Sequence, residues 1–369
     1  IFTKMIIKKE TLLRKLVLAS RFTASNFSSN VLLSGVFLKK EKNILHFYST
    51  NLNFYFHSFL KVEEKDDFEF VVEPKKLIDF LSYLPQSEID LLFGEKKIII
   101  KAQKNQGEFP LFPKEEFPLP PEIEEKKQPI KTDFLKKNLP LVLFACAADE
   151  SRPVLTGINF SSENDELLLV GTDGFRLSLL RIEKEINFPQ IIVSATFLKE
   201  VLYFIDKEET ISFCFSNKEK TIYFKIGDID LYSRIIDGDY PPFEKVIPNQ
   251  EGKTKVTVEK DLFLQNLKLI NVFVRDFSNI VVFEIKKEGI YLRPKGEEGN
   301  QGNQSFLEAE VFGDEIKVAF NAKFLFDFLN HTQGKNISFE ILQPDAPVVF
   351  KDEKTKNFLH IIMPVRIQE

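Results

Sequence analysis

A strand followed by a short amphipathic helix occurs three times in the sequence, and this repeat limits the fold more than any other feature. It is found in FVVEPKKLIDFLSYL, IIVSATFLKEVLYFI and KVAFNAKFLFDFL. The three helices superimpose with offsets of 121 and 127 residues. The matched positions are Leu77, Asp79 and Leu81, then Leu198, Glu200 and Leu202, then Leu325, Asp327 and Leu329. A period of this length predicts a chain built from three similar modules.

Each repeat also contains a second helix and an apolar hairpin pattern. The second helix is expected near residues 8–22, 131–147 and 258–273, and the hairpins follow the helices described above. Runs rich in proline, glutamate or glycine at 117–129 and 247–255 read as linkers. We therefore predict an α+β protein with three tandem domains of two helices on antiparallel sheets, covering residues 1–123, 124–250 and 251–369.

The charge of the chain is distributed unevenly. The whole sequence has 50 lysines and arginines against 55 acidic residues, yet the six predicted helices carry 14 basic against nine acidic residues. A basic set of helices on an acidic body favours contact with a polyanion that does not depend on its sequence. The residues expected to face DNA are Lys8, Lys9, Arg14, Lys15, Arg21, Lys75, Lys76, Lys136, Lys137, Arg152 and Lys199.

Several other classes of protein are disfavoured. Cys146 and Cys214 lie far apart in apolar stretches, which favours two buried thiols in a reducing compartment. The sequence contains neither an apolar run long enough to span a membrane nor a secretory signal pattern, so we expect a cytoplasmic protein with no membrane partner. His46, His57, His331 and His360 show no metal-ligand spacing, and GEEGNQGN (296–303) lacks the lysine of a nucleotide loop. We expect no metal, no cofactor and no catalytic residues.

Four segments carry a resemblance to a known family. They are ESRPVLTGINFSSENDELLLVGTDGFRLSLL (150–180), DGDYPPFEKVIP (237–248), FNAKFLFDFLN (320–330) and IIMPVRI (361–367). In this order they resemble the bacterial sliding clamps, the beta subunits of DNA polymerase III. The resemblance implies a head-to-tail homodimeric ring with helices lining the hole, which encircles double-stranded DNA without catalysing a reaction. It further implies that the DNA polymerase III alpha subunit, the clamp-loader complex, other DNA polymerases and repair proteins are partners.

The resemblance also implies a cleft that takes a short peptide of the Gln-Leu-x-Leu-Phe type from these partners. Apolar walls, a flexible methionine and arginines at the rim suit such a peptide. Phe175 stands where some relatives have histidine, and Lys245 stands at a rim position often held by arginine, so the peptide preference is expected to differ. The implied cleft residues are Leu155, Thr172, Gly174, Phe175, Arg176, Leu177, Pro241, Pro242, Val246, Asn321, Phe324, Ile361, Met363, Pro364, Val365 and Arg366.

The same resemblance implies a joint between two copies of the chain. An edge near Phe109 and Leu111 is expected to meet a helix that carries Leu269, Val272 and Phe273. Pro110 lies within that edge and is unfavourable for strand pairing.

Two other functions stay open at this point. One is a three-repeat protein-interaction scaffold that does not bind DNA, which would not need basic residues concentrated on its helices. The other is a hydrolase whose site follows no familiar pattern, which would turn over a substrate without a partner.

Overall fold

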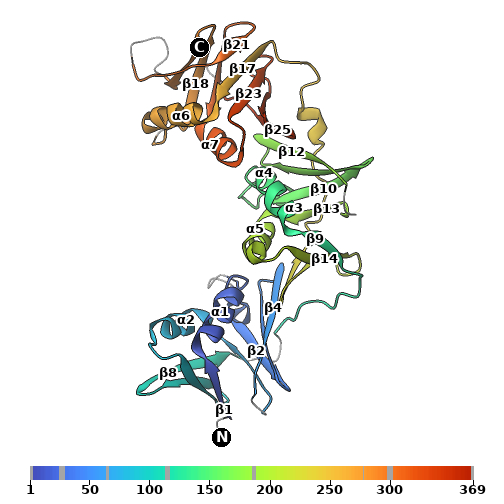
Figure 1. The fold of residues 1–369 in the computed structure, drawn as a ribbon, viewed down its shortest axis with the longest axis vertical. Helices are drawn as coiled ribbons and strands as arrows, with labels where there is room; N and C mark the ends of the chain where they lie inside the picture. Colours follow the sequence, from blue (N-terminus) through green and yellow to red (C-terminus); the bar gives the residue numbers. More distant parts are fainter. Residues whose placement is uncertain are drawn as a thin grey trace. The chain divides into compact units, whose positions relative to one another are not determined.

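The computed structural model describes residues 3–24, 30–63, 66–112, 117–184, 188–276, 278–296 and 302–366. Most of the glycine-rich loop 296–303 lies outside these ranges. The chain forms two compact units. Figure 1 shows the ribbon coloured by position in the sequence. Unit 1 consists of Ile1–Thr132 and Glu200–Ile235, and unit 2 of Asp133–Lys199 and Ile236–Glu369.

Unit 1 contains one sheet of twelve strands, and its described pairings are all antiparallel. In strands such as β6, buried residues alternate with half-buried or exposed ones, which shows that one face of the sheet packs into the core. The strands in sheet order are β1 (Thr3–Lys8), β6 (Glu88–Phe93), β7 (Lys97–Ala102), β8 (Asn105–Phe112), β5 (Phe68–Val72), β2 (Val36–Glu41), β3 (Ile44–Thr50), β4 (Phe54–Lys61), β16 (Ile229–Arg234), β15 (Thr221–Ile226), β14 (Thr210–Ser216) and β9 (Gln128–Lys131).

Two helices of unit 1 cover this sheet. Helix α1 (Lys9–Ser20) packs against α2 (Pro74–Tyr83) and against strands β1 to β4. It buries Leu12, Leu16 and Ala19, whose spacing places them on one face of a helix. A short 3₁₀ helix, η1 (Val31–Ser34), precedes β2.

Unit 2 contains a sheet of nine strands and a sheet of four. The larger has the order β13 (Ile191–Ser194), β10 (Gly157–Glu163), β11 (Glu166–Thr172), β12 (Arg176–Glu183), β25 (Thr355–Ile362), β24 (Val348–Asp352), β23 (Asn336–Ile341), β17 (Thr254–Glu259) and β21 (Glu310–Phe312). The smaller has the order β20 (Ser305–Leu307), β19 (Gly289–Pro294), β18 (Ile280–Lys286) and β22 (Ile316–Asn321).

Helices α6 (Lys260–Val274) and α7 (Ala322–His331) pack together in unit 2, and α4 (Pro140–Leu143) packs against β11 and β12. Its 3₁₀ helices are η2 (Pro153–Thr156) and η4 (Phe243–Val246). Two of the boundaries between the units fall inside helices, one within α3 (Thr132–Asn138) and one at Glu200 in α5 (Ala195–Phe204). A short 3₁₀ helix, η3 (Ile205–Lys207), follows α5. Among the described residues, no helix is long and apolar enough to cross a membrane.

All six predicted helical regions are helical, with one correction. The helix expected over 131–147 is divided into α3 and α4 and ends at Leu143. Pro140 lies at the start of α4, and its ring nitrogen cannot donate the hydrogen bond that would continue α3.

Two strand pairings join parts of the chain that are distant in sequence, and we call them the first and second joint. In the first joint, within unit 1, β4 pairs with β16 and His57 lies opposite Asp230. The His57 ring Nδ1 is 2.8 Å from the Asp230 carboxylate. In the second joint, within unit 2, β12 pairs with β25 and Ser178 lies opposite His360, with the serine Oγ 2.9 Å from the ring Nδ1.

Candidate functional site

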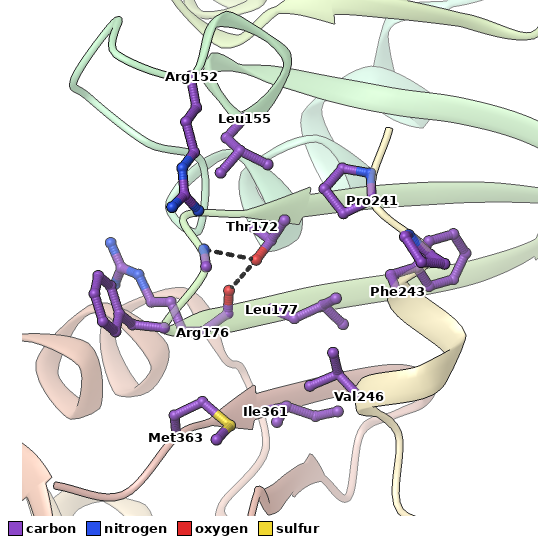
Figure 2. Close-up of a pocket in the computed structure, with 13 residues that line it drawn as sticks. Arg152, Leu155, Thr172, Arg176, Leu177, Pro241, Phe243, Val246, Ile361 and Met363 are labelled. Atoms are coloured by element: carbon purple, nitrogen blue, oxygen red, sulfur yellow. Dashed lines mark hydrogen bonds between the residues drawn. The ribbon is translucent and has the colours of Figure 1, made fainter. Parts of the chain in front are cut away.

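The main candidate site is a cleft in unit 2 that encloses about 560 Å³ of space open to solvent. Figure 2 shows its walls, which come from η2, the turn between β11 and β12, the segment that leads into η4, and the end of β25. The lining residues are Arg152, Leu155, Thr172, Gly174, Phe175, Arg176, Leu177, Pro241, Pro242, Phe243, Val246, Ile361 and Met363.

The turn between β11 and β12 is fixed by its own side chains. The Thr172 hydroxyl donates to the Arg176 carbonyl at 2.5 Å and accepts from the Gly174 N–H at 3.1 Å (Figure 2). The Asp173 carboxylate accepts from the N–H groups of Phe175 and Arg176 at 2.9 and 3.0 Å. Gly174 has a φ of +90°, which favours glycine. The turn therefore presents Phe175, with 66% of its surface exposed, in a defined position.

Arg176 is held beneath this turn by two carboxylates. Its Nε donates to Asp173 at 2.9 Å and its Nη1 donates to Asp327 of α7 at 2.6 Å. The guanidinium lies over the ring of Phe324, 4.5 Å from the ring centre, and the residue is only 6% exposed. Its charge is thus compensated within the protein, and Arg176 shapes the wall of the cleft more than it attracts a ligand by charge.

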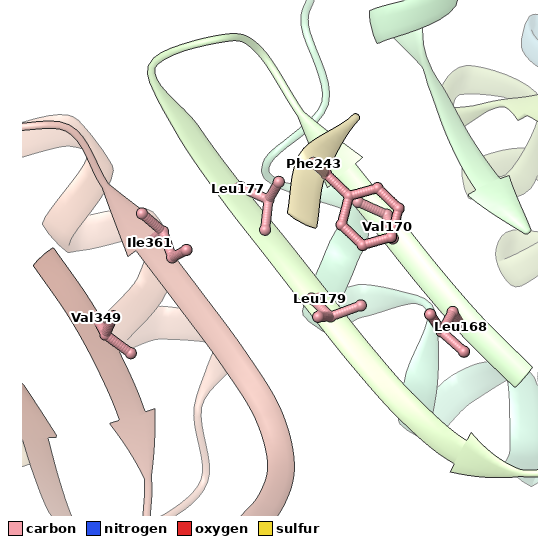
Figure 3. Close-up of a cluster of buried hydrophobic side chains, with 7 residues drawn as sticks. All are labelled: Leu168, Val170, Leu177, Leu179, Phe243, Val349 and Ile361. Carbon is pink, nitrogen blue, oxygen red and sulfur yellow. The ribbon is translucent and has the colours of Figure 1, made fainter. Parts of the chain in front are cut away.

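The floor of the cleft is apolar and continuous with the core. A buried cluster joins side chains of β11, β12, β24, β25 and η4 across the second joint, as Figure 3 shows. Met363 follows β25, and its N–H donates to the Phe175 carbonyl at 2.8 Å, which fixes the edge of the floor. The members of the cluster are Leu168, Val170, Leu177, Leu179, Phe243, Val349 and Ile361.

Eleven of the expected cleft residues line the cleft, and the remaining five lie elsewhere. Asn321 accepts a hydrogen bond from the Lys323 N–H as the N-cap of α7, Phe324 lies against Arg176, and the Val365 N–H donates to the Ala319 carbonyl. Pro364 and Arg366, half-buried and exposed respectively, follow Met363. None of these five is among the residues that line the described cleft.

Two lining residues were not expected in the cleft. Phe243 was missed, although two prolines precede it and its side chain is buried in the floor. Arg152, which was expected to face DNA, contributes to the cleft wall. An apolar residue directly after a proline pair is the only sequence signal that could have identified Phe243.

The expected DNA-facing cations differ in their surroundings. Lys15 is 7% exposed, and its ammonium donates to the Ser58 hydroxyl at 2.5 Å and to the Asp228 carboxylate. The expectation that Lys15 offers an exposed charge is therefore wrong. Lys9 donates to the Leu84 carbonyl at 2.6 Å, and Lys136 is half-buried. The exposed members are Lys8, Arg14, Arg21, Lys75, Lys76, Lys137, Arg152 and Lys199.

Arg21 is exposed but engaged. Its Nε and Nη2 donate to the two oxygens of Glu200 at 2.6 and 2.9 Å, and its guanidinium lies 4.1 Å from the ring centre of Tyr203. This bidentate pair holds the end of α1 against α5 within unit 1.

The residues expected to join two copies fall into two groups. Leu269, Val272 and Phe273 of α6 are 45 to 56% exposed, so this helix presents an apolar surface. Phe109 in β8 is buried and lies 5.5 Å from the ring of Phe80, whereas Leu111 is half-buried and pairs with Val72 of β5.

Three family models match the chain in order. They describe the N-terminal, central and C-terminal domains of the DNA polymerase III beta subunit, and they match residues 3–121, 129–242 and 244–366. The chain belongs to this family. Its fold is therefore three tandem clamp domains, and we call the matched ranges modules I, II and III.

Similar proteins extend over nearly the whole chain. The Beta sliding clamp of Synechocystis is 25% identical and covers 99% of both chains, and that of Bacillus subtilis is 25% identical and covers 91% of this chain and 92% of its own. The crystal structure of the beta subunit from Thermotoga maritima superimposes with a TM-score of 0.88 at 24% identity, covering 99% of this chain and all of its own. The Bacillus subtilis sliding clamp superimposes with a TM-score of 0.89 at 22% identity, covering both chains completely.

Proposed function

We propose that this protein is a DNA sliding clamp, a cytoplasmic processivity factor that encircles duplex DNA and tethers the replicative polymerase without catalysing a reaction. The apolar cleft of unit 2, in a chain of the DNA polymerase III beta subunit family, is the observation that carries this proposal. The scaffold alternative has no comparable support. A scaffold that does not bind DNA would need neither basic helices nor membership of the DNA polymerase III beta subunit family.

The cleft suits a short peptide with apolar anchors. Leu155, Leu177 and Ile361 offer a dry floor for leucine and phenylalanine side chains, and Met363 can adapt its rotamer to several partners. Such a peptide would come from the DNA polymerase III alpha subunit, the clamp-loader complex, or other DNA polymerases and repair proteins, which would then compete for one site.

Contact with DNA would be electrostatic and independent of sequence. Exposed cations such as Arg14, Lys75 and Lys76 lie on α1 and α2, and phosphate contacts of this kind hold a duplex without fixing its position. Two copies arranged head to tail would close a ring with helices around the hole, so that the clamp slides because no base is read.

A peptide-binding titration tests the cleft. A labelled Gln-Leu-x-Leu-Phe peptide should bind the wild-type protein, and Val246→Glu should weaken binding at least about tenfold because a carboxylate would enter an apolar wall. Val31→Glu is the matched control, since Val31 is an exposed valine of unit 1 and should leave affinity within about twofold. Equal affinity of Val246→Glu and wild type would refute the cleft as the docking site.

Charge reversal tests the DNA contacts. The triple variant Arg14→Glu, Lys75→Glu and Lys76→Glu should reduce retention on closed circular DNA and flatten its salt dependence. Lys218→Glu, at a side chain that is 82% exposed in a turn of unit 1, controls for a change of charge alone. Unchanged retention in the triple variant would contradict the proposal. In gel filtration the wild-type protein should elute near twice 42.8 kDa.

A further inference from the structure

The first and second joints share one plan. In each, the fourth strand of one module pairs with the last strand of the next module: β4 of module I with β16 of module II, and β12 of module II with β25 of module III. Each pairing aligns five residues of one strand with five of the other.

Both joints also carry an arginine clasp on the same acidic position of the repeat, with the arginine at the end of α1 in the first joint and at the start of β12 in the second. Arg21 of module I pairs with Glu200 in α5, and Arg176 of module II pairs with Asp327 in α7. Glu200 and Asp327 are equivalent residues of the threefold repeat. In each clasp the guanidinium also lies over an aromatic ring one helical turn from the acid, Tyr203 in the first and Phe324 in the second.

The third copy of the acidic position has no such arginine. Asp79 of α2 is exposed and forms no ion pair with any residue that the structure describes. Tyr83 lies one turn from it and is 88% exposed, so an aromatic ring is available beside the acid. The strand that corresponds to β16 and β25 is β8, and within the described chain only Leu111 and Phe112 of β8 pair with β5.

The complementary half of a joint lies on module III. Arg275 is the C-cap residue of α6, as Arg21 is of α1, and its side chain is 61% exposed. Its described ion pair is a long one of 3.7 Å to the neighbouring Asp276. The strand that corresponds to β4 and β12 is β20, which lies at the edge of the four-stranded sheet with Phe306 exposed.

We propose that Arg275 of one copy pairs with Asp79 of a second copy, and so forms a third clasp between modules III and I. A second copy of this chain is the partner that fits. Each copy carries the acidic side of a joint on module I and the arginine side on module III, so two copies can form two such joints with each other. This inference rests on the proposed clamp, whose two-copy ring requires such a joint. The clasp fixes the alignment of the joint. The leucine and phenylalanine side chains of α6, exposed in a single copy, become buried around it when the two copies associate.

A charge swap tests this clasp in the full-length protein. Sedimentation velocity over a range of concentrations gives the dimer dissociation constant of wild type, Arg275→Asp, Asp79→Arg and the double variant. Each single reversal should raise the constant by at least about tenfold, because two like charges would face each other, and the double variant should recover most of the loss. Lys287→Glu, an exposed lysine in the turn after β18, is the control of equal sign and should stay within about twofold.

The outcomes separate the clasp from the clamp itself. A wild-type protein that stays monomeric near 42.8 kDa overturns both proposals. A wild-type dimer whose dissociation constant does not respond to the single reversals, or is not restored by the swap, overturns the clasp and leaves the clamp intact. Thermal unfolding of each variant confirms that a weaker dimer does not reflect an unfolded module.

Discussion

The two joints share a backbone plan but keep their charges in different surroundings. The Arg21 side chain of the first joint is 35% exposed, whereas that of Arg176 in the second is 6% exposed and forms part of the cleft wall. The polar side chains that face each other across the paired strands differ as well. In the first joint His57 faces the charged Asp230, and in the second His360 faces the neutral Ser178. A repeated joint can therefore tolerate different chemistry, and the buried version occurs beside the apolar cleft of unit 2.

The largest difference between the joints should follow from removing each arginine. Arg176→Ala leaves Asp173 and Asp327 without their shared cation, and we expect unit 2 to lose about 3 to 5 kcal/mol of unfolding free energy. Urea unfolding measures the loss. Arg176→Lys should recover only part of it, because an ammonium group cannot reproduce the forked contacts. A loss below about 1 kcal/mol would show that the buried clasp contributes little.

The charged pair of the first joint should make unit 1 sensitive to strong acid. Burial acts to raise the pKa of Asp230, but hydrogen bonds from His57 and other neighbours outweigh it and lower the pKa to about 2. A carboxyl group with a lowered folded pKa stabilises the fold above its unfolded pKa, and this stability is lost as pH falls from about 4 to 2. It amounts to about 2 kcal/mol. Asp230→Asn should remove this dependence, measured as hydrogen exchange of the β4 and β16 amides against pH, and an unchanged profile would contradict it.

The neutral pair of the second joint should respond at a higher pH. Burial holds the pKa of His360 well below its usual value, and the positive charge of nearby Arg176 and the neighbouring His331 act in the same direction. The unfolded chain then binds a proton that the folded chain does not, so stability falls as pH decreases below about 6.5, by up to about 1.4 kcal/mol per pH unit. Hydrogen exchange of the β12 and β25 amides measures this, and His360→Asn should reduce the slope. If amide protection in the two joints were lost at the same pH, the charged and neutral pairs would not differ in their response to acid.

The smallest effect is expected at the exposed clasp. Arg21→Ala should cost about 0.2 to 1 kcal/mol, because water screens the pair with Glu200. The loss should shrink further in high salt, which thermal unfolding of wild type and variant at two salt concentrations would show. A loss as large as that of Arg176→Ala would mean that exposure does not decide the strength of these clasps.

Local patterns predicted the helices, and the resemblance to the sliding clamps implied much of the cleft. The helices around Leu77, Leu198 and Leu325 follow from apolar spacing, which depends only on neighbours along the chain. The partners of charged residues were not predictable in this way. Lys15 reads as a cation on a basic helix, and only the fold reveals Asp228, 213 residues away, as its partner.

The cleft shows the same limit. Arg176 was expected among its residues, but its role as a clasp depends on Asp327, which is 151 residues distant. Phe243 was missed because a buried phenylalanine in a proline-rich segment has no periodic neighbours to mark it. The resemblance thus implied most of the residues that line the cleft, but not the contacts that hold its walls.

The pairing of β4 with β16 has a consequence for the segment 117–129, which connects the strands of module I to those of module II. These two strands and the Arg21 clasp come from opposite sides of that segment, so they join the two parts of unit 1 by contacts that do not involve it. A single proteolytic cut there would sever the backbone yet leave two fragments associated through a shared sheet. Module I and the rest of the chain could then be produced separately and recombined as a complementing split pair.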